Sequence, residues 1–396
     1  MLVIVAPGQG AQTPGFLQPW LEDPTFAARF DWLSTVAGVD LAHYGTEGDA
    51  EQIRDTRIAQ PLLVATGLVA ALELFPHPAD AFDKIGAVTG HSVGEIAAAA
   101  GARTITAEQA MVLVRERGNA MAAAADATPT GMTAVLGGDR EEVLATLERH
   151  GVVAANDNGP GQLVAAGTLE QLDALAADPP AKAKLRPLSV AGAFHTEHMA
   201  PAVDHVARLA RSVSVHDPRT PFISNRDGQA VHDGTDVLRR IVGQIARPVR
   251  WDLCLETMAD LGVTGILEMP PAGTLTGIAK RYFRGQGVET FALDSPDQLD
   301  AARDFCEQHG EASTIDSTPT WRMVVSPAKG VFHRDEAAAD ADALEAGVPI
   351  GSVASLRDRI PVTAAHGGQV VEWLVEDGDP VSPGQPLLRL HPLGAA

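Results

Sequence analysis

The sequence contains little of what several classes of protein require. Only two of its 396 residues are cysteines, Cys254 and Cys306, so neither a disulfide framework nor a metal site with cysteine spacing can be built from them. Basic residues are also few, because 30 Lys and Arg against 51 Asp and Glu give a net charge of -21, which repels phosphate backbones. We therefore expect a protein of the reducing cytoplasm that does not bind nucleic acid.

Long apolar runs are missing as well. No window approaches the roughly 18 apolar residues of a membrane helix, so we expect no association with a membrane. The first apolar run, residues 2–6, ends at Pro7 and follows no basic leader, which favours a buried first strand over a signal peptide. Aromatic residues amount to only 5%, so Val, Leu, Ile and Ala must fill the core.

Short β-rich runs alternate with Ala- and Leu-rich runs over roughly the first 300 residues, which is typical of an α/β domain with a mostly parallel sheet. Residues 2–6 and 85–90 are predicted strands. Residues 61–75 are a predicted buried helix, and residues 107–121 a predicted amphipathic helix that ends near Gly118.

The order of the elements changes within residues 122–190, where the pattern predicts a β-α-β-β-α-β succession. That succession is the ferredoxin-like arrangement, and it indicates a small subdomain inserted into an α/β body formed by residues 1–121 and 191–305. Residues 306–320 are polar and are predicted to be a linker, and residues 321–396 contain short apolar runs between Gly, Pro and Asp turns. This last segment is predicted to be a small all-β domain.

One short motif indicates an activated serine. Residues 90–94 match G-x-S-x-G, with a predicted strand before Ser92 and a helix-forming stretch after it. Such a turn strains the serine and exposes its hydroxyl, while the helix amides, the Val93 N–H among them, are available to a negative oxygen. With 38 glycines in the chain, a loop serine that matches by chance is the alternative.

A serine nucleophile needs a base, and the chain offers 13 histidines. His195 is the favoured candidate because it follows a predicted strand and lies between small residues where the insert rejoins the body. His198, three residues further on, is the main competitor. His91 is weaker, because successive side chains at a tight turn point apart.

The chain resembles the malonyl-CoA:acyl-carrier-protein transacylases, the acyltransferases of fatty-acid and polyketide synthesis. Seven segments occur in the order found in that family: APGQGAQ (6–12), GHSVGE (90–95), RGNAM (117–121), GAFHT (192–196), SNRDG (224–228), VGQIARPVRW (242–251) and GTLTGIAKR (273–281). The resemblance covers roughly residues 1–300 and implies an α/β-hydrolase-like body with a ferredoxin-like insert.

The resemblance also implies the roles of the site residues. Ser92 would be the acylated nucleophile and His195 its base, oriented by the main-chain carbonyl of Gln244 rather than by an aspartate. The amides of Gln9 and Val93 would form the oxyanion hole.

Further residues would contact the acyl group. Arg117 would hold the free carboxylate of a malonyl group. The alternative, which would be favoured without this motif, is that Arg117 is a solvent-exposed arginine near the end of a helix. Phe194 is typical of malonyl-selecting rather than methylmalonyl-selecting members, because its ring would occlude an α-methyl group. The remaining expected cleft residues are His91, Gln60, Asn156 and Asn158.

Residues 321–396 resemble the biotinyl/lipoyl carrier fold. In carrier domains a hairpin presents the lysine that bears the prosthetic group, and here residues 352–359 would form that hairpin with Ser355 in the place of the lysine. Because no lysine follows Lys329, we expect no biotin or lipoate on this domain. A structural appendage, or one that docks an acyl-CoA carboxylase subunit or the carrier protein, is the favoured interpretation.

These patterns predict an acyltransferase without a cofactor. A malonyl-serine intermediate would carry malonyl from malonyl-CoA to the phosphopantetheine thiol of an acyl carrier protein. Two alternatives remain at this stage: a serine hydrolase or editing thioesterase that uses the same turn, and a scaffold that links an acyl-CoA carboxylase to the carrier protein. No aspartate-bearing motif is found where a hydrolase triad needs one, which argues against the hydrolase.

Overall fold

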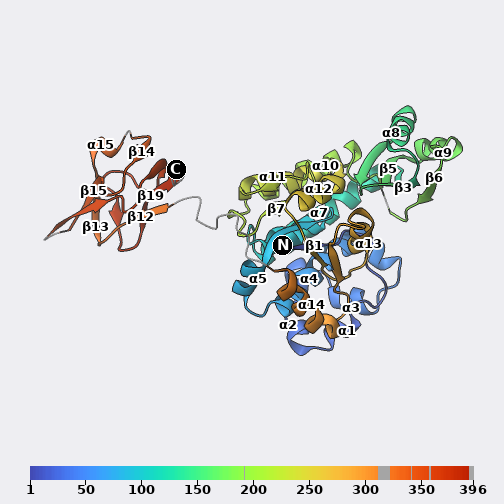
Figure 1. Cartoon of the computed structure of the whole chain (residues 1–396), viewed down its shortest axis with the longest axis horizontal. Helices are drawn as coiled ribbons and strands as arrows, with labels where there is room; N and C mark the ends of the chain where they lie inside the picture. Colours follow the sequence, from blue (N-terminus) through green and yellow to red (C-terminus); the bar gives the residue numbers. More distant parts are fainter. Residues whose placement is uncertain (191, 311–321, 340, 356–357, 392–396) are drawn as a thin grey trace. The chain divides into compact units, whose positions relative to one another are not determined.

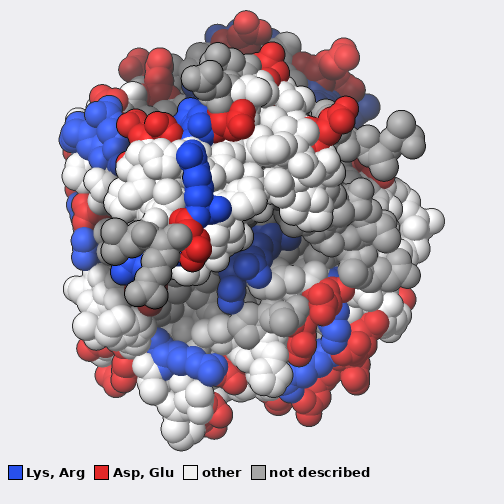
Figure 2. Space-filling model, turned by 90° about the vertical axis from the view of Figure 1, so that its left-hand side faces the viewer, with Lys and Arg blue, Asp and Glu red and all other residues white. Residues whose placement is uncertain are grey.

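The computed structural model describes residues 1–190, 192–310, 322–339, 341–355 and 358–391. The chain divides into two compact units, Met1–Ser313 and Thr314–Ala396 (Figure 1). Both acidic and basic side chains are present on the surface shown in Figure 2.

The first unit is built on a six-stranded sheet in the order β11-β10-β1-β2-β7-β8. All neighbouring pairs are parallel except β7 and β8, as expected for an α/β body. The strands are β1 (Leu2–Ala6), β2 (Ile85–Gly90), β7 (Phe222–Ile223), β8 (Ala230–Val231), β10 (Gly265–Glu268) and β11 (Glu289–Ala292).

Both faces of this sheet are covered. Successive β1 residues belong to opposite cores, because Leu2 packs into the larger apolar cluster while Val3 packs into a second one. A strand that is buried on both faces has a continuous apolar sequence, and for this reason residues 2–6 and 85–90 could be predicted as strands. The helices of this unit are α1 (Gln18–Leu21), α2 (Pro24–Ala37), α3 (Leu41–Thr46), α4 (Thr56–Leu74), α5 (Pro78–Lys84), α6 (Gly94–Gly101), α7 (Ala107–Ala127), α10 (Ala200–Ala210), α11 (Gly234–Gln244), α12 (Trp251–Asp260), α13 (Thr274–Tyr282) and α14 (Leu299–His309).

Two of these helices correct the sequence interpretation. Among the described residues α4 is long and apolar enough to cross a membrane, contrary to the expectation that no segment approaches this limit, but 67% of its most apolar window is buried within the protein. Helix α7 does not end near Gly118 but continues to Ala127, past the expected start of the insert at residue 122. A Cβ at Gly118 would lie 2.8 Å from the carbonyl oxygen of Thr56, so this glycine allows α4 and α7 to pack closely instead of ending the helix.

The insert has the expected β-α-β-β-α-β succession: β3 (Thr130–Gly137), α8 (Arg140–Arg149), β4 (Val153–Asp157), β5 (Gln162–Thr168), α9 (Leu169–Ala177) and β6 (Ala183–Pro187). Its elements lie together at one end of the first unit (Figure 1). The sheet order is β6-β3-β5-β4-β9, in which the fifth strand, β9 (Val249–Arg250), comes from the body and runs parallel to β4. The sequence did not reveal this pairing.

The second unit contains two four-stranded sheets, in the orders β12-β19-β17-β14 and β16-β15-β13-β18. Its core includes Phe332, Ile350 and Leu387, each fully buried. The short helix α15 (Glu336–Ala339) was not expected in an all-β domain. The strands are β12 (Arg322–Val325), β13 (Gly330–Arg334), β14 (Ala343–Leu344), β15 (Pro349–Ala354), β16 (Arg359–Thr363), β17 (Gly368–Trp373), β18 (Pro380–Val381) and β19 (Pro386–His391).

Two predicted segments lie partly outside the described residues. Residues 306–309 of the expected linker belong to α14, and residues 311–320 are not described. The expected hairpin at residues 352–359 corresponds to the antiparallel pair β15 and β16, of which residues 356–357 are not described.

Candidate active site

Ser92 lies on a sharp turn between β2 and α6. Its φ of 54° is in the left-handed region that non-glycine residues rarely adopt. A Cβ at Gly90 would lie 2.0 Å from the carbonyl carbon of Gly94, and a Cβ at Gly94 would lie 2.3 Å from the carbonyl oxygen of Ala6. Both glycines of the motif are therefore required by the close approach of the strand, the turn and the helix.

His195 meets Ser92 directly. Its Nε2 lies 2.7 Å from Ser92 Oγ, and its Nδ1 lies 2.8 Å from the main-chain oxygen of Gln244. A carbonyl oxygen can only accept, so in the neutral imidazole Nδ1 carries the proton and Nε2 is free to accept from the serine hydroxyl. The described residues contain no hydrogen bond between Ser92 and His198, the competing candidate.

Burial holds His195 in its neutral form. The ring is 3% exposed, and burial, reinforced by the positive charge of Arg117, lowers its pKa from 6.5 to about 3, although the hydrogen bond to Gln244 opposes the shift. At neutral pH the imidazole is unprotonated and can act as a base.

Arg117 lies in α7 and is buried, with an exposed fraction of 1%, so its interpretation as an exposed helix arginine does not hold. It donates to Gln60 Oε1 at 2.7 Å and to Gln244 Oε1 at 3.0 Å, and its Nη2 is 3.4 Å from Ser92 Oγ. Burial lowers its pKa to about 10, which leaves it charged at neutral pH. Within the described chain its Nε has no hydrogen-bond partner and the guanidinium pairs with no carboxylate.

Sequence reasoning missed two residues that join these groups. Glu95, in the first turn of α6, accepts from the Asn225 N–H at 2.6 Å and from Gln244 Nε2 at 2.5 Å. Asn225 Oδ1 in turn accepts from the Ser92 N–H at 2.9 Å. The sequence offered one signal for Glu95, which is the single charged residue in the otherwise apolar stretch GEIAAAAG. A carboxyl group buried in such a helix needs hydrogen-bond partners elsewhere in the protein.

The remaining predicted residues have less direct links to this centre. His91 Nε2 lies 2.9 Å from Asn158 Oδ1, and burial lowers the pKa of His91. Phe194 and Val93 are buried beside His195 and Ser92 in sequence. Asn156 Oδ1 is buried without a hydrogen-bond partner among the described residues, which do not connect it to Ser92 or His195.

Gln9 uses its side chain outside the turn, donating from Nε2 to the Arg54 carbonyl at 3.1 Å. Its loop nevertheless lies against the turn, because a Cβ at Gly8 would be 2.8 Å from the main-chain oxygen of His91. The described residues contain no group of three or more His, Cys, Asp or Glu side chains that could hold a metal ion.

The carboxyl of Glu95 gives a measurable pH dependence of stability. Burial raises its pKa from 4.5 to about 8, so between these values the folded state binds more protons than the unfolded state. Its contribution to the free energy of unfolding is therefore fully present below pH 4.5 and is lost as the pH rises through about 8. We expect Glu95→Gln to remove this dependence, so that the variant gains stability relative to the native chain as the pH increases.

Urea unfolding of both proteins across this pH range measures the difference. Glu51→Gln, at an exposed position, is the matched control and should show a constant difference from the native chain. A difference between Glu95→Gln and the native chain that stays constant with pH would contradict the assignment.

Comparison with known proteins identifies the family. Residues 3–319 match the acyl transferase domain family. The malonyl CoA-acyl carrier protein transacylase of Mycobacterium tuberculosis is 50% identical over 300 residues, which cover 76% of this chain and 98% of the relative. A crystal structure of MCAT from that organism aligns with a TM-score of 0.73, at 50% identity, over 76% of this chain and 99% of its own. A type II PKS acyl-carrier protein complex, PlMCAT:AntF, contains a malonyl-transacylase that aligns with a TM-score of 0.70, at 28% identity, over 76% of this chain and 99% of its own. The chain therefore belongs to the acyl transferase family, among the malonyl CoA-acyl carrier protein transacylases.

Proposed function

We propose that this chain carries malonyl from malonyl-CoA to the phosphopantetheine thiol of an acyl carrier protein, through a malonyl ester on Ser92 and without a cofactor. The observation that carries the proposal is Arg117, a buried and charged guanidinium without a carboxylate partner among the described residues, 3.4 Å from Ser92 Oγ. Removing one partner from a buried ion pair leaves an uncompensated charge, which is strongly unfavourable. An acyl group that brings its own carboxylate would compensate this charge.

The first half-reaction acylates Ser92. Its oxygen attacks the thioester carbonyl carbon while the hydroxyl proton passes to His195 Nε2, 2.7 Å away. The carbon–sulfur bond breaks, and CoA leaves as a thiol with the proton returned by His195. The main-chain N–H groups of Val93 and Gln9 would stabilise the oxyanion, and the helix dipole of α6 would add to this effect.

The second half-reaction repeats these steps with a different thiol. The carrier thiol gives its proton to His195 and attacks the ester carbonyl carbon. The ester carbon–oxygen bond then breaks, and Ser92 recovers the proton. The names of the relatives and the solved carrier-protein complex support a thiol rather than water as the acceptor.

Acyl selectivity would come from two side chains with different chemistry. Arg117 can offer Nε and Nη2 to one carboxylate in a bidentate pair, for which a planar guanidinium is suited. Phe194, buried next to the base, would limit the space for an α-methyl group. Gln60 and Gln244 hold the guanidinium in place through their side-chain oxygens. His91, Asn156 and Asn158 would line the cleft.

We further propose that residues 321–396 are a biotinyl/lipoyl-like domain without an attachment lysine, and that this domain docks an acyl-CoA carboxylase subunit or the carrier protein. The hairpin of β15 and β16 supports this proposal, with Ser355 directly after β15, and no lysine follows Lys329. The cytoplasm is the expected compartment, because both cysteines are free and buried.

A transfer assay tests the main proposal. Incubation with malonyl-CoA and holo carrier protein should give malonyl-carrier protein, and without the carrier the chain should gain one malonyl group. Ser92→Ala should abolish both products, as intact mass spectrometry measures. Release of free malonate with no malonyl-carrier protein would contradict transfer and favour a hydrolase.

The role of Arg117 predicts a change of acyl preference. We expect Arg117→Gln to reduce kcat/KM for malonyl-CoA on the order of a hundredfold, because the substrate carboxylate would be buried without its charged partner. Acetyl-CoA lacks that carboxylate, so its kcat/KM should change much less. Arg115→Gln, two residues earlier on α7, is the matched control and should leave both values near those of the native chain. Equal losses for malonyl and acetyl substrates would refute carboxylate recognition.

The docking proposal predicts that the second unit contributes to partner binding. Deleting residues 316–396 should weaken capture of the carboxylase subunit or the carrier protein in a pull-down, while Ser92 should still accept malonyl from malonyl-CoA. Unchanged capture and unchanged transfer rate would rule out docking by this domain.

A further inference from the structure

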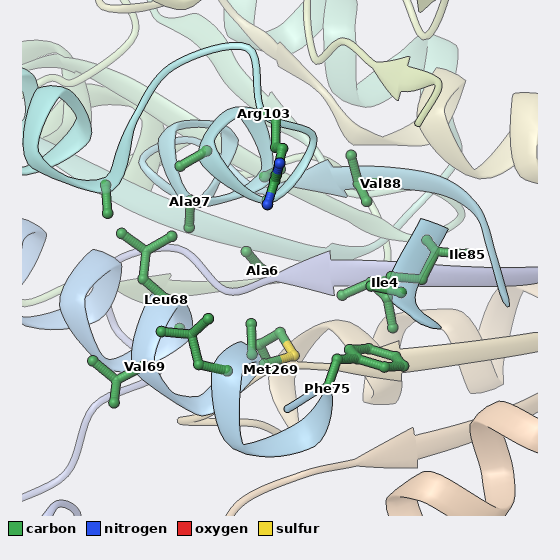
Figure 3. Close-up of a pocket in the computed structure, with 18 of the residues that line it drawn as sticks. Ile4, Ala6, Leu68, Val69, Phe75, Ile85, Val88, Ala97, Arg103 and Met269 are labelled. Atoms are coloured by element: carbon green, nitrogen blue, oxygen red, sulfur yellow. The ribbon is translucent and has the colours of Figure 1, made fainter. Parts of the chain in front are cut away.

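A second pocket lies apart from the serine centre. It has a volume of about 550 Å³, is open to solvent, and is lined by residues of α2, α4, α5, α6 and α7 and of strands β1 and β2 (Figure 3). Ser92, His195 and Arg117 do not line it. Pockets for small molecules typically measure about 300–1,000 Å³, whereas packing voids in a core rarely exceed a water molecule.

The walls of this pocket are apolar. Ile4, Val88 and Met269 form the side of the sheet, and Leu68 and Val69 of α4 face them (Figure 3). Helix α6 contributes only small residues to the pocket, among them Ala97, Ala98 and Gly101, so its alanine-rich sequence leaves the space unfilled. The walls therefore suit a hydrocarbon chain and offer few polar partners.

Apolar side chains also stand at the opening. Trp32 is 56% exposed and Leu72 is 41% exposed, and both line the pocket. Large apolar side chains exposed at the edge of an apolar cavity are a common feature of ligand-binding sites. A ligand from solvent can reach the cavity across them.

One lining cation has no anionic partner. The side chain of Arg103 extends toward the cavity (Figure 3), and it stacks on the Phe82 ring with a distance of 5.4 Å to the centroid. Arg219 stacks on the same ring at 5.6 Å. Neither guanidinium has a carboxylate partner within the described part of the chain. The other charged lining groups are engaged: Arg29 pairs with Glu73 at 2.7 Å, and Glu108 accepts from Trp32 Nε1 at 3.4 Å.

The backbone at Arg103 gives independent support. This residue follows the end of α6 with a φ of 61°, at a position where helices usually have glycine. The Thr104 N–H donates to the Ala99 carbonyl at 2.9 Å, which is the hydrogen bond of that helix ending. An arginine is held there at some conformational cost, and its side chain lines the pocket.

We propose that this pocket binds a fatty acid, with the hydrocarbon chain along the apolar walls and the carboxylate on Arg103. A guanidinium pairs with a carboxylate through two parallel hydrogen bonds, and the apolar volume accounts for the chain. The pocket adjoins the same strand and helix, β2 and α6, that carry Ser92. The proposal does not depend on the transfer activity.

Isothermal titration of the full-length chain with decanoate, in the absence of malonyl-CoA, tests the proposal. We expect saturable binding of one decanoate per chain, and decanol, which has the same chain without the charge, should bind about tenfold more weakly, because a hydrogen-bonded charge pair is lost. Arg103→Gly should weaken decanoate binding about tenfold and leave decanol binding unchanged. Glycine suits the left-handed backbone at this position, so the variant should fold at least as well as the native chain.

Two further variants complete the design. Ala100→Phe, at a partly exposed lining position of α6, should fill the cavity and abolish binding of both ligands. Arg211→Gly, at an exposed arginine after α10 that does not line the pocket, should bind like the native chain. Thermal unfolding of each variant shows that it is folded. No saturable binding by the native chain, unchanged decanoate binding in Arg103→Gly, or unchanged binding in Ala100→Phe would each overturn the proposal.

Discussion

Gln244 connects His195, Arg117 and Glu95 through three hydrogen bonds of different kinds. Its main-chain oxygen accepts from the His195 ring, its side-chain oxygen accepts from Arg117, and its side-chain nitrogen donates to Glu95. One residue at the end of α11 therefore fixes the tautomer of the base and the position of the guanidinium. Since the same side-chain nitrogen also lies 3.2 Å from the Ser92 carbonyl oxygen, the turn that carries the nucleophile is part of this arrangement. A change of the α11 end would disturb all of these groups together.

Two arginines without carboxylate partners among the described residues differ in what surrounds them. Arg117 is buried and held by amide oxygens, and the nearby carboxyl of Glu95, which raises the pKa of Arg117, only partly offsets the effect of burial. Arg103 is exposed and stacked on Phe82, where water compensates its charge and a carboxylate would compete with water. The proposed acyl site would therefore depend mainly on a buried charge pair, and the proposed fatty-acid pocket mainly on apolar contacts.

The features that were predictable from the sequence were those set by neighbouring residues. The strand, the strained turn and the helix around Ser92 follow from an apolar run, two glycines and an alanine-rich stretch, and the structure has all three. The role of Glu95 was not predictable, because a lone acidic residue in an apolar helix does not reveal which distant amides it meets. Gly118 was misread for a related reason: whether a glycine ends a helix or admits a neighbour depends on the packing of α4. The pairing of β9 with β4 involves only two residues of β9, too few to give a pattern.

That short pairing also links the insert to the body. The insert carries Asn156 and Asp157 on β4, and these residues are in register with Val249 and Arg250 of the body. Arg140 of the insert also pairs with Asp252, at the start of α12. A hinge that swung the insert away from the body would have to break this ladder and this ion pair in the same step. The insert is therefore joined to the body by main-chain hydrogen bonds as well as by side chains, so its position does not depend on the covalent connections alone.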